Sequence, residues 1–150
     1  MKSILSCLAA LLVDGAAPAA TAPSPTPGIL EQYFVIQRSL AADTTTGIQA
    51  AALKLARLSR QAATQDPKAG AQLAAVSQAA TRLQTSDLKT ARNEFGELSK
   101  QVTAWLQVAG GEKPYQFYCS MANKAWLQQD KQTRNPYYGK SMLTCGELIP

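Results

Sequence analysis

Apolar side chains return every three or four residues between residues 28 and 110, which is the spacing of an amphipathic helix. Interruptions divide this stretch into four apolar series, which are Ile29, Tyr33, Ile36 and Leu40; Ile48, Ala51, Leu55, Leu58 and Ala62; Leu73, Val76, Ala80 and Leu83; and Leu88, Ala91, Phe95, Leu98, Val102 and Trp105. Polar residues occupy the opposite faces, as Lys54, Arg57 and Arg60 do in the second series. The pattern predicts four helices and a mainly α fold.

Start and stop signals lie between the four series. The segment from Asp43 to Thr46 is typical of a turn that ends in a helix cap. Asp66 followed by Pro67 is typical of a cap and a first-turn proline, and residues 85–87 supply the next helix start. Glycines 110–111 end the last helix. Because the connections are short, consecutive helices should be antiparallel neighbours, so we predict an up-and-down four-helix bundle.

The N-terminus has the order of a short secretory signal. Lys2 precedes the apolar run Ile4 to Val13, and small residues and proline follow as far as Ala20. Because a membrane span needs about 20 apolar residues and Asp14 interrupts this run, no stable membrane insertion is expected. A fortuitous hydrophobic N-terminus is the alternative interpretation.

These features predict the domain boundaries and the compartment. Residues 1–20 are the expected signal peptide, 21–27 a flexible arm, and 28–149 a single helical domain with its Cys/Met motif in 115–146. Cys7 falls in the discarded leader, which leaves two cysteines in the mature chain. The expected location is periplasmic or secreted.

Composition excludes several classes of function. The chain has no histidine, so the usual general base, the usual zinc ligand and every Ser-His or Cys-His arrangement are missing. The net charge of +5 comes from bases spread between Arg38 and Lys140, which does not predict nucleic-acid binding. Glu94 and Glu97 stand without the Glu-x-x-His pairs of di-iron bundles. We therefore predict that the chain is not an enzyme.

The composition changes after Gly111. Six of the ten aromatic residues lie in a short span, namely Tyr115, Phe117, Tyr118, Trp126, Tyr137 and Tyr138. The segment from Tyr115 to Cys119 fits a short strand, and Asn135-Pro136 marks a turn. The rest is predicted to be loop-rich. Such a segment needs a covalent staple or a metal to be ordered.

Four sulfur-containing residues lie within this aromatic segment or shortly after it. Cys119 and Met121 are two residues apart, which in an extended segment places both sulfurs on one side. Met142 and Cys145 are three apart, which in a helical turn again places both on one face. If the chain folds back between the two pairs, the four sulfurs converge. Thiolate and thioether ligands select monovalent copper, Cu(I), or another soft metal ion.

A disulfide is the alternative use of the same cysteines. In an oxidising compartment, two cysteines most often pair, and a Cys119–Cys145 bridge would stabilise the fold by about 3.5 kcal/mol through loop closure. Met121 and Met142 would then be ordinary core residues. The disulfide and the thiolate metal site exclude each other at any one moment, and the residues alone leave both open.

The tail also resembles a known family. The resemblance rests on Tyr118-Cys119-Ser120-Met121-Ala122, Trp126-Leu127, Asn135-Pro136-Tyr137-Tyr138-Gly139 and Met142-Leu143-Thr144-Cys145-Gly146. These strings are similar to a bacterial domain of unknown function that occurs alone behind a signal peptide or attached to periplasmic adaptor subunits of heavy-metal and copper efflux systems. That family typically has proline at the position of Ser120, a change that leaves the sulfur positions intact.

The resemblance spans roughly residues 28–149 and implies a cell-envelope location and a heavy-metal efflux adaptor as partner. It carries Cys119, Met121, Met142 and Cys145 over as a candidate metal site and implies no catalytic activity. Two hypotheses follow. The first is a soft-metal-binding protein linked to efflux. The second is a disulfide-stapled, non-enzymatic interaction domain that presents Tyr137, Tyr138 and Trp126 to a protein partner.

Overall fold

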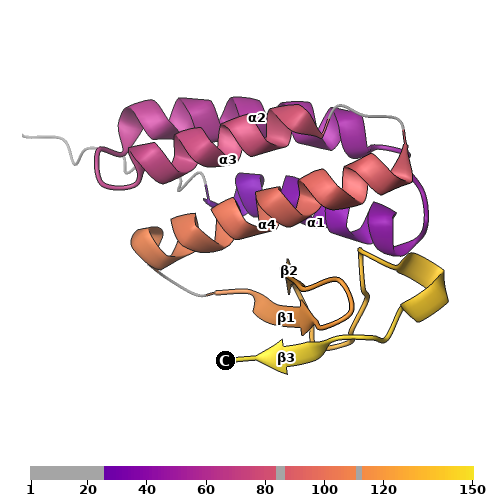
Figure 1. Ribbon diagram of the computed structural model, residues 1–150. Coiled ribbons are helices and arrows are strands. Elements are labelled where there is room, and N and C mark those ends of the chain that lie inside the picture. The colour runs from indigo at the N-terminus through magenta and orange to yellow at the C-terminus, as the bar shows by residue number, and fades with distance from the viewer. Residues whose placement is uncertain (1–25, 84–86, 111–112) are drawn as a thin grey trace, which may run out of the picture.

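The computed structural model describes residues 26–83, 87–110 and 113–150, and within them the fold is mainly α, as predicted. In chain order the elements are α1 (Thr26–Ala41), α2 (Ile48–Gln65), α3 (Gly70–Arg82), α4 (Leu88–Ala109), β1 (Tyr115–Cys119), β2 (Lys124–Gln128), the 3-10 helix η1 (Gly139–Met142) and β3 (Glu147–Ile149). Figure 1 shows the helices above a small sheet. No helix in the described ranges combines the length and the apolar character needed to cross a membrane.

Most of the predictions for the N-terminus concern residues that the structure does not describe. The predicted signal peptide, residues 1–20, lies outside the described residues, as do residues 21–25 of the predicted arm. The last two residues of that arm, Thr26 and Pro27, instead open α1. Proline is tolerated in the first helical turn because the amide hydrogen it lacks has no partner within the helix there.

The helices bury the side chains that the periodicity marks. Of the predicted apolar positions, only Leu58 and Leu88 are half-buried, and all the others are buried. Each helix packs on the next in the chain, and α1 also contacts α4. Trp105, Tyr33 and Phe95 are the largest side chains of the helical core. The core therefore depends on a few large residues set among alanines.

The ends of α4 match the sequence signals. Asp87 is its N-cap, and the carboxylate accepts a hydrogen bond from the Thr90 amide at 2.9 Å. Gly110 ends the helix with a φ of 72°, a conformation that glycine adopts without strain.

The starts of α2 and α3 differ from the predictions. The N-cap of α2 is Gly47, which has no capping side chain. The α3 helix begins at Gly70, three residues after the predicted first-turn proline. Asp66 still acts as a cap, because its carboxylate accepts the amides of Lys68 and Ala69 in the turn that leads into the helix. A side chain at Gly70 would meet the carbonyl oxygen of Ala63 at 2.9 Å, so the glycine permits close approach of α3 to α2.

The tail holds more regular structure than the predicted loop-rich segment. Its strands form an antiparallel sheet in the order β2-β1-β3. The predicted strand is β1, and Phe117 faces Trp126 of β2 and Leu148 of β3. The other two strands were missed, because β2 lacks an alternating burial pattern and β3 has only three residues. Their stability comes from pairing with β1, which periodicity does not reveal.

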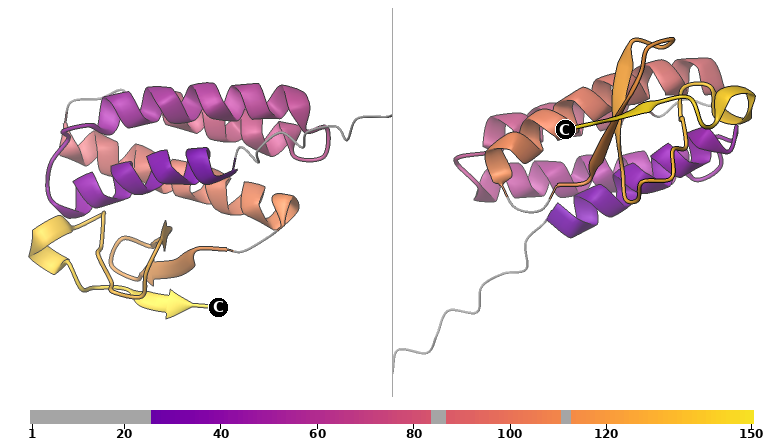
Figure 2. Two further views of the ribbon diagram at one scale, coloured as in Figure 1. Left: turned by 180° about the vertical axis from the view of Figure 1, so that it is seen from behind. Right: turned by 90° about the horizontal axis from the view of Figure 1, so that it is seen from below.

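The sheet lies against the side of the helical layer formed by α1 and α4. Both views in Figure 2 place it there, and among the described residues neither α2 nor α3 contacts a strand. Tyr33 joins the layers, because its hydroxyl shares a 2.7 Å hydrogen bond with Ser99 Oγ and accepts one from the Leu127 amide at 3.0 Å. Burial raises the pKa of the Tyr33 phenol, which therefore stays protonated.

Candidate functional site

The two cysteines of the tail lie side by side. Cys119 is the last residue of β1 and is fully buried, whereas Cys145 lies just before β3 and is half-buried. Their sulfur atoms are 4.0 Å apart, and both are free thiols. The pairing of Tyr118 with Glu147 explains the approach, because continuing this antiparallel register brings the residues just before β3 alongside the end of β1.

Asn135 holds the segment that carries Cys145. Its side-chain Nδ2 donates to the Cys145 carbonyl at 2.6 Å, while Oδ1 accepts the amides of Tyr137 and Tyr138. Its own amide donates to the Leu143 carbonyl at 2.7 Å. Because Asn135 is completely buried, these bonds replace water and fix the chain on both sides of η1.

A second set of contacts ties η1 to the helices, and it centres on Asp43 and Arg92. The Arg92 guanidinium donates to the Asp43 carboxylate, to the Leu40 carbonyl at 3.1 Å and to the Pro136 carbonyl at 3.0 Å. Asp43 also accepts the Lys140 amide at 3.0 Å. We call these contacts the Asp43–Arg92 clasp. Its hydrogen bonds, from Arg92 first and then from Lys140, lower the pKa of Asp43 below its ordinary value.

The two methionines occupy different surroundings from the thiols. Met121 lies in the turn between β1 and β2 with 63% of its surface exposed, and its carbonyl accepts the Tyr138 hydroxyl. Met142 ends η1 and is half-buried, and its carbonyl accepts the Cys145 amide at 3.0 Å. Within the described ranges no hydrogen-bonding contact joins either thioether to a thiol. The structure thus brings two of the four predicted sulfurs together.

The aromatic residues of the tail mostly form a core. Trp126 is fully buried and stacks on Phe117 with ring centroids 5.3 Å apart. Tyr137 is also buried and meets Trp126 edge to face. Tyr138 is half-buried. The interaction-domain hypothesis expects Tyr137, Tyr138 and Trp126 to face a partner, but Trp126 and Tyr137 are enclosed by the protein.

Cys145 lies in a setting that favours its protonated thiol. Desolvation is the main cause that raises the pKa of Cys145, followed by the hydrogen bond with Cys119 and the negative charges of Cys119 and Glu147. At neutral pH the Cys145 thiol is therefore not an activated nucleophile. Two chemical outcomes remain open to the pair. The sulfurs can bind a soft metal ion and release their protons to water, or an oxidant can take two electrons and two protons from them and leave a disulfide.

Among the described residues no group of three or more cysteine, aspartate or glutamate side chains is placed to hold a metal ion. A metal site in this part of the chain would therefore rest on the two thiols and on thioether sulfur.

Asn135, Asp43 and Arg92 support the site but were not among the predicted site residues. Asn135 carried a sequence signal, since Asn-Pro marks a turn, yet its bond to Cys145 depends on how that turn packs. Asp43 and Arg92 are separated by 49 residues, and nothing in the sequence pairs them.

No protein-family model matches the chain, and neither a curated protein nor a solved structure is detectably similar to it. The site is therefore interpreted from its own geometry and chemistry.

Proposed function

We propose that this chain is a soft-metal-binding protein of the bacterial cell envelope that holds a Cu(I) ion between Cys119 and Cys145. The observation that carries the proposal is the 4.0 Å separation of the two sulfurs. A thiolate bond to a closed-shell metal ion is roughly 2.3 Å long, so one ion can contact both sulfurs without a movement of the backbone. Sulfur ligands select Cu(I) over magnesium, calcium or manganese, and structural zinc needs four ligands.

The methionines enter the proposal as additional ligands. Met121 follows Cys119 by two residues, and Met142 precedes Cys145 by three, so each lies on a turn beside one thiol. Methionine has three rotatable bonds and a polarisable sulfur, and rotation of these side chains could bring the thioethers to a bound ion. Cys119 and Cys145 are thus the primary ligands, and Met121 and Met142 the secondary ones.

The proposed cellular role is transfer of copper to or from a heavy-metal efflux adaptor in the periplasm. The signal-like N-terminus and the family resemblance of the tail motif support this role. In this proposal the four helices form an up-and-down bundle that carries the tail, and the protein has no catalytic activity, nucleic-acid partner or stable membrane insertion.

Competition with a Cu(I) chelator, run anaerobically on reduced protein, tests the proposal. The wild-type protein should take up one Cu(I) ion, and Cys119→Ser or Cys145→Ser should weaken its binding about 100-fold, because serine offers no soft ligand and the chain has no histidine to replace it. Met121→Leu and Met142→Leu conserve volume and should weaken binding by smaller factors. Chelator competition that is the same for all four variants and the wild type would end the metal proposal.

The same sulfur contact supports a second candidate, a disulfide-stapled interaction domain. Oxidation of Cys119 and Cys145 would join two sulfurs that already touch. Burial of Trp126 and Tyr137 leaves Tyr138 as the member of that aromatic group that could meet a partner. Thiol titration of protein isolated without reductant separates the candidates. Free thiols favour metal binding, and their absence favours the staple.

Copper affinity should rise with pH over an unusually wide range. Binding displaces the thiol proton of Cys145, so affinity should increase about tenfold per pH unit for that proton while the thiol stays protonated. Because the pKa of Cys145 is raised above the ordinary 9.0, the increase should continue beyond pH 9. Anaerobic chelator competition from pH 7 to about 10 measures the slope. Cys145→Ser should give a shallower slope, and a wild-type plateau below pH 9 would contradict the prediction.

A further inference from the structure

A glycine in the middle of α4 marks a second site. Gly96 lies well inside the helix, where glycine costs about 1 kcal/mol relative to alanine. A Cβ there would meet Lys124 Cδ at 2.8 Å and Cε at 3.1 Å. The glycine therefore provides the space in which the Lys124 side chain crosses α4.

The ammonium group of Lys124 is held in place but not neutralised. Its Nζ donates to Asn93 Oδ1 at 3.1 Å and lies 5.6 Å from the centroid of the Tyr137 ring. Within the part of the chain that the structure describes, no carboxylate forms an ion pair with it. An ammonium has three donors, and Asn93 accepts only one. Lys124 is thus an oriented cation that still has hydrogen-bond donors available for a ligand.

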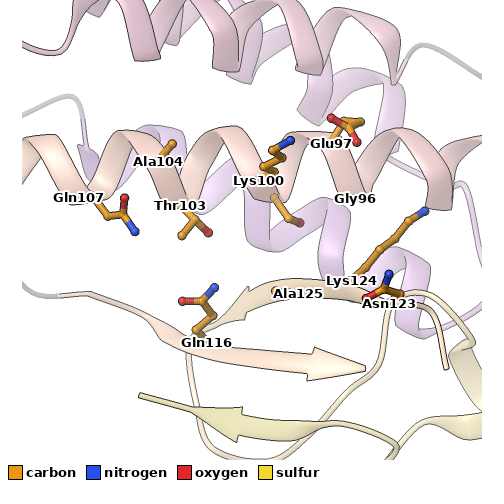
Figure 3. Close-up of a pocket in the computed structure, with 11 residues that line it drawn as sticks. Gly96, Glu97, Lys100, Thr103, Ala104, Gln107, Gln116, Asn123, Lys124 and Ala125 are labelled. Carbon is orange, nitrogen blue, oxygen red and sulfur yellow. The ribbon is translucent and has the colours of Figure 1, made fainter. Parts of the chain in front are cut away.

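Two surface hollows meet at Lys124. One, of about 400 Å³, lies between α4 and the β1–β2 hairpin, and the other, of about 660 Å³, lies at the first turns of α4. Figure 3 shows the first hollow, in which Thr103 and Gln107 of α4 face Gln116 of β1. No hydrogen bond within the described ranges uses these three side chains. A volume of this size suits a small ligand, and the free amide and hydroxyl groups suit a polar one.

The charges around the hollows favour an anion. Lys89, Lys100 and Lys124 line them, and none of the three forms an ion pair with another described residue, whereas Arg92 is paired with Asp43. Glu97 is the acidic side chain that lines the first hollow. The excess of positive charge attracts an anionic group and orients it toward Lys124.

Sheet extension by a peptide strand is blocked at this place. The outer edge of β2 is already used, because the Leu127 amide donates to the Tyr33 hydroxyl and the Ala125 carbonyl accepts the Tyr137 hydroxyl. A ligand must therefore be recognised by side chains rather than by the sheet backbone, which favours a small molecule over a docked strand.

We propose that the groove between α4 and the β1–β2 hairpin binds a small organic anion, with its carboxylate or phosphate group on Lys124 and Lys100 and its polar groups on Thr103, Gln107 and Gln116. This site uses neither thiol, so it stands apart from the proposed copper function.

Isothermal titration of the full chain with citrate and with inorganic phosphate, at low ionic strength, tests the proposal. Millimolar or tighter binding is expected for at least one probe, and the stronger one identifies carboxylate or phosphate as the preferred group. Lys124→Met keeps the aliphatic stem, removes the charge and should weaken binding about tenfold. Gly96→Ala should also weaken binding, because the new methyl group displaces the lysine stem while alanine favours the helix.

Lys54→Met is the matched control, because it removes one exposed positive charge on α2, away from the groove. It should leave binding unchanged, and melting curves for all variants confirm that each is folded. Absence of binding by both probes at about 10 mM would overturn the proposal. So would equal weakening by Lys54→Met and Lys124→Met, since that pattern means diffuse attraction to a basic protein.

Discussion

Replacing Gly139 by alanine should lower the free energy of unfolding by about 2–6 kcal/mol. Gly139 has a φ of 56°, which costs a residue with a Cβ about 1–3 kcal/mol in strain. That Cβ would also collide with the Asp43 carboxylate and the Arg92 guanidinium, and overpacking of this kind costs about 1–3 kcal/mol more. Urea denaturation of the reduced variant and the reduced wild type measures the difference.

Gly47→Ala separates backbone strain from collision. Gly47 has a φ of 80°, yet a Cβ there would meet nothing within 4 Å. This control should lose only the strain energy. Equal losses at the two positions would show that the Asp43–Arg92 clasp tolerates the methyl group. The Gly139 variant should also form the Cys119–Cys145 disulfide more slowly, because the clasp anchors η1, which precedes Cys145.

Tyr33→Phe should cost about 2–4 kcal/mol although it removes a single oxygen atom. The hydroxyl accepts the buried Leu127 amide, and an unpartnered buried amide costs about 1–3 kcal/mol. The hydrogen bond with Ser99 is lost as well, at about 1 kcal/mol. Thermal unfolding followed by circular dichroism measures the total loss of stability. The lost stability should come from the contact between the helices and β2.

Tyr118→Phe is the control for that experiment. Its hydroxyl donates to Asn123 Oδ1 in an exposed position, where water replaces the lost partner. A change within about 0.5 kcal/mol is expected. If Tyr33→Phe were equally mild, the hydroxyl would not be what joins the helices to the sheet.

The helical half of the fold could be predicted because its signals are local. A helix buries residues three and four positions apart, so Phe95, Leu98, Val102 and Trp105 mark one face whatever packs against it. Asp87 and Gly110 act within one turn of the residues they cap. The starts of α2 and α3 differ from the predictions by a few residues, because a short turn precedes each helix.

The candidate site depends on contacts that no local pattern encodes. The spacings of Cys119 with Met121 and of Met142 with Cys145 favoured a four-sulfur cluster, whereas the structure places the two thiols in contact and leaves Met121 largely exposed. The strand register sets that contact, and the exposed turn after β1 carries Met121 to the surface. The roles of methionine in copper binding remain a prediction.

The sequence by itself determined the mainly α class, the faces that form the helical core, β1 and the two cysteines available to the tail. Tertiary structure alone decided that β2 and β3 pair with β1, that Asn135 holds Cys145, that Asp43 meets Arg92 and that Lys124 crosses Gly96. The physical reason is the distance along the chain over which each kind of interaction acts. Periodicity and capping act over a few residues, whereas these contacts join residues from different elements and form only when the helices and the sheet pack together.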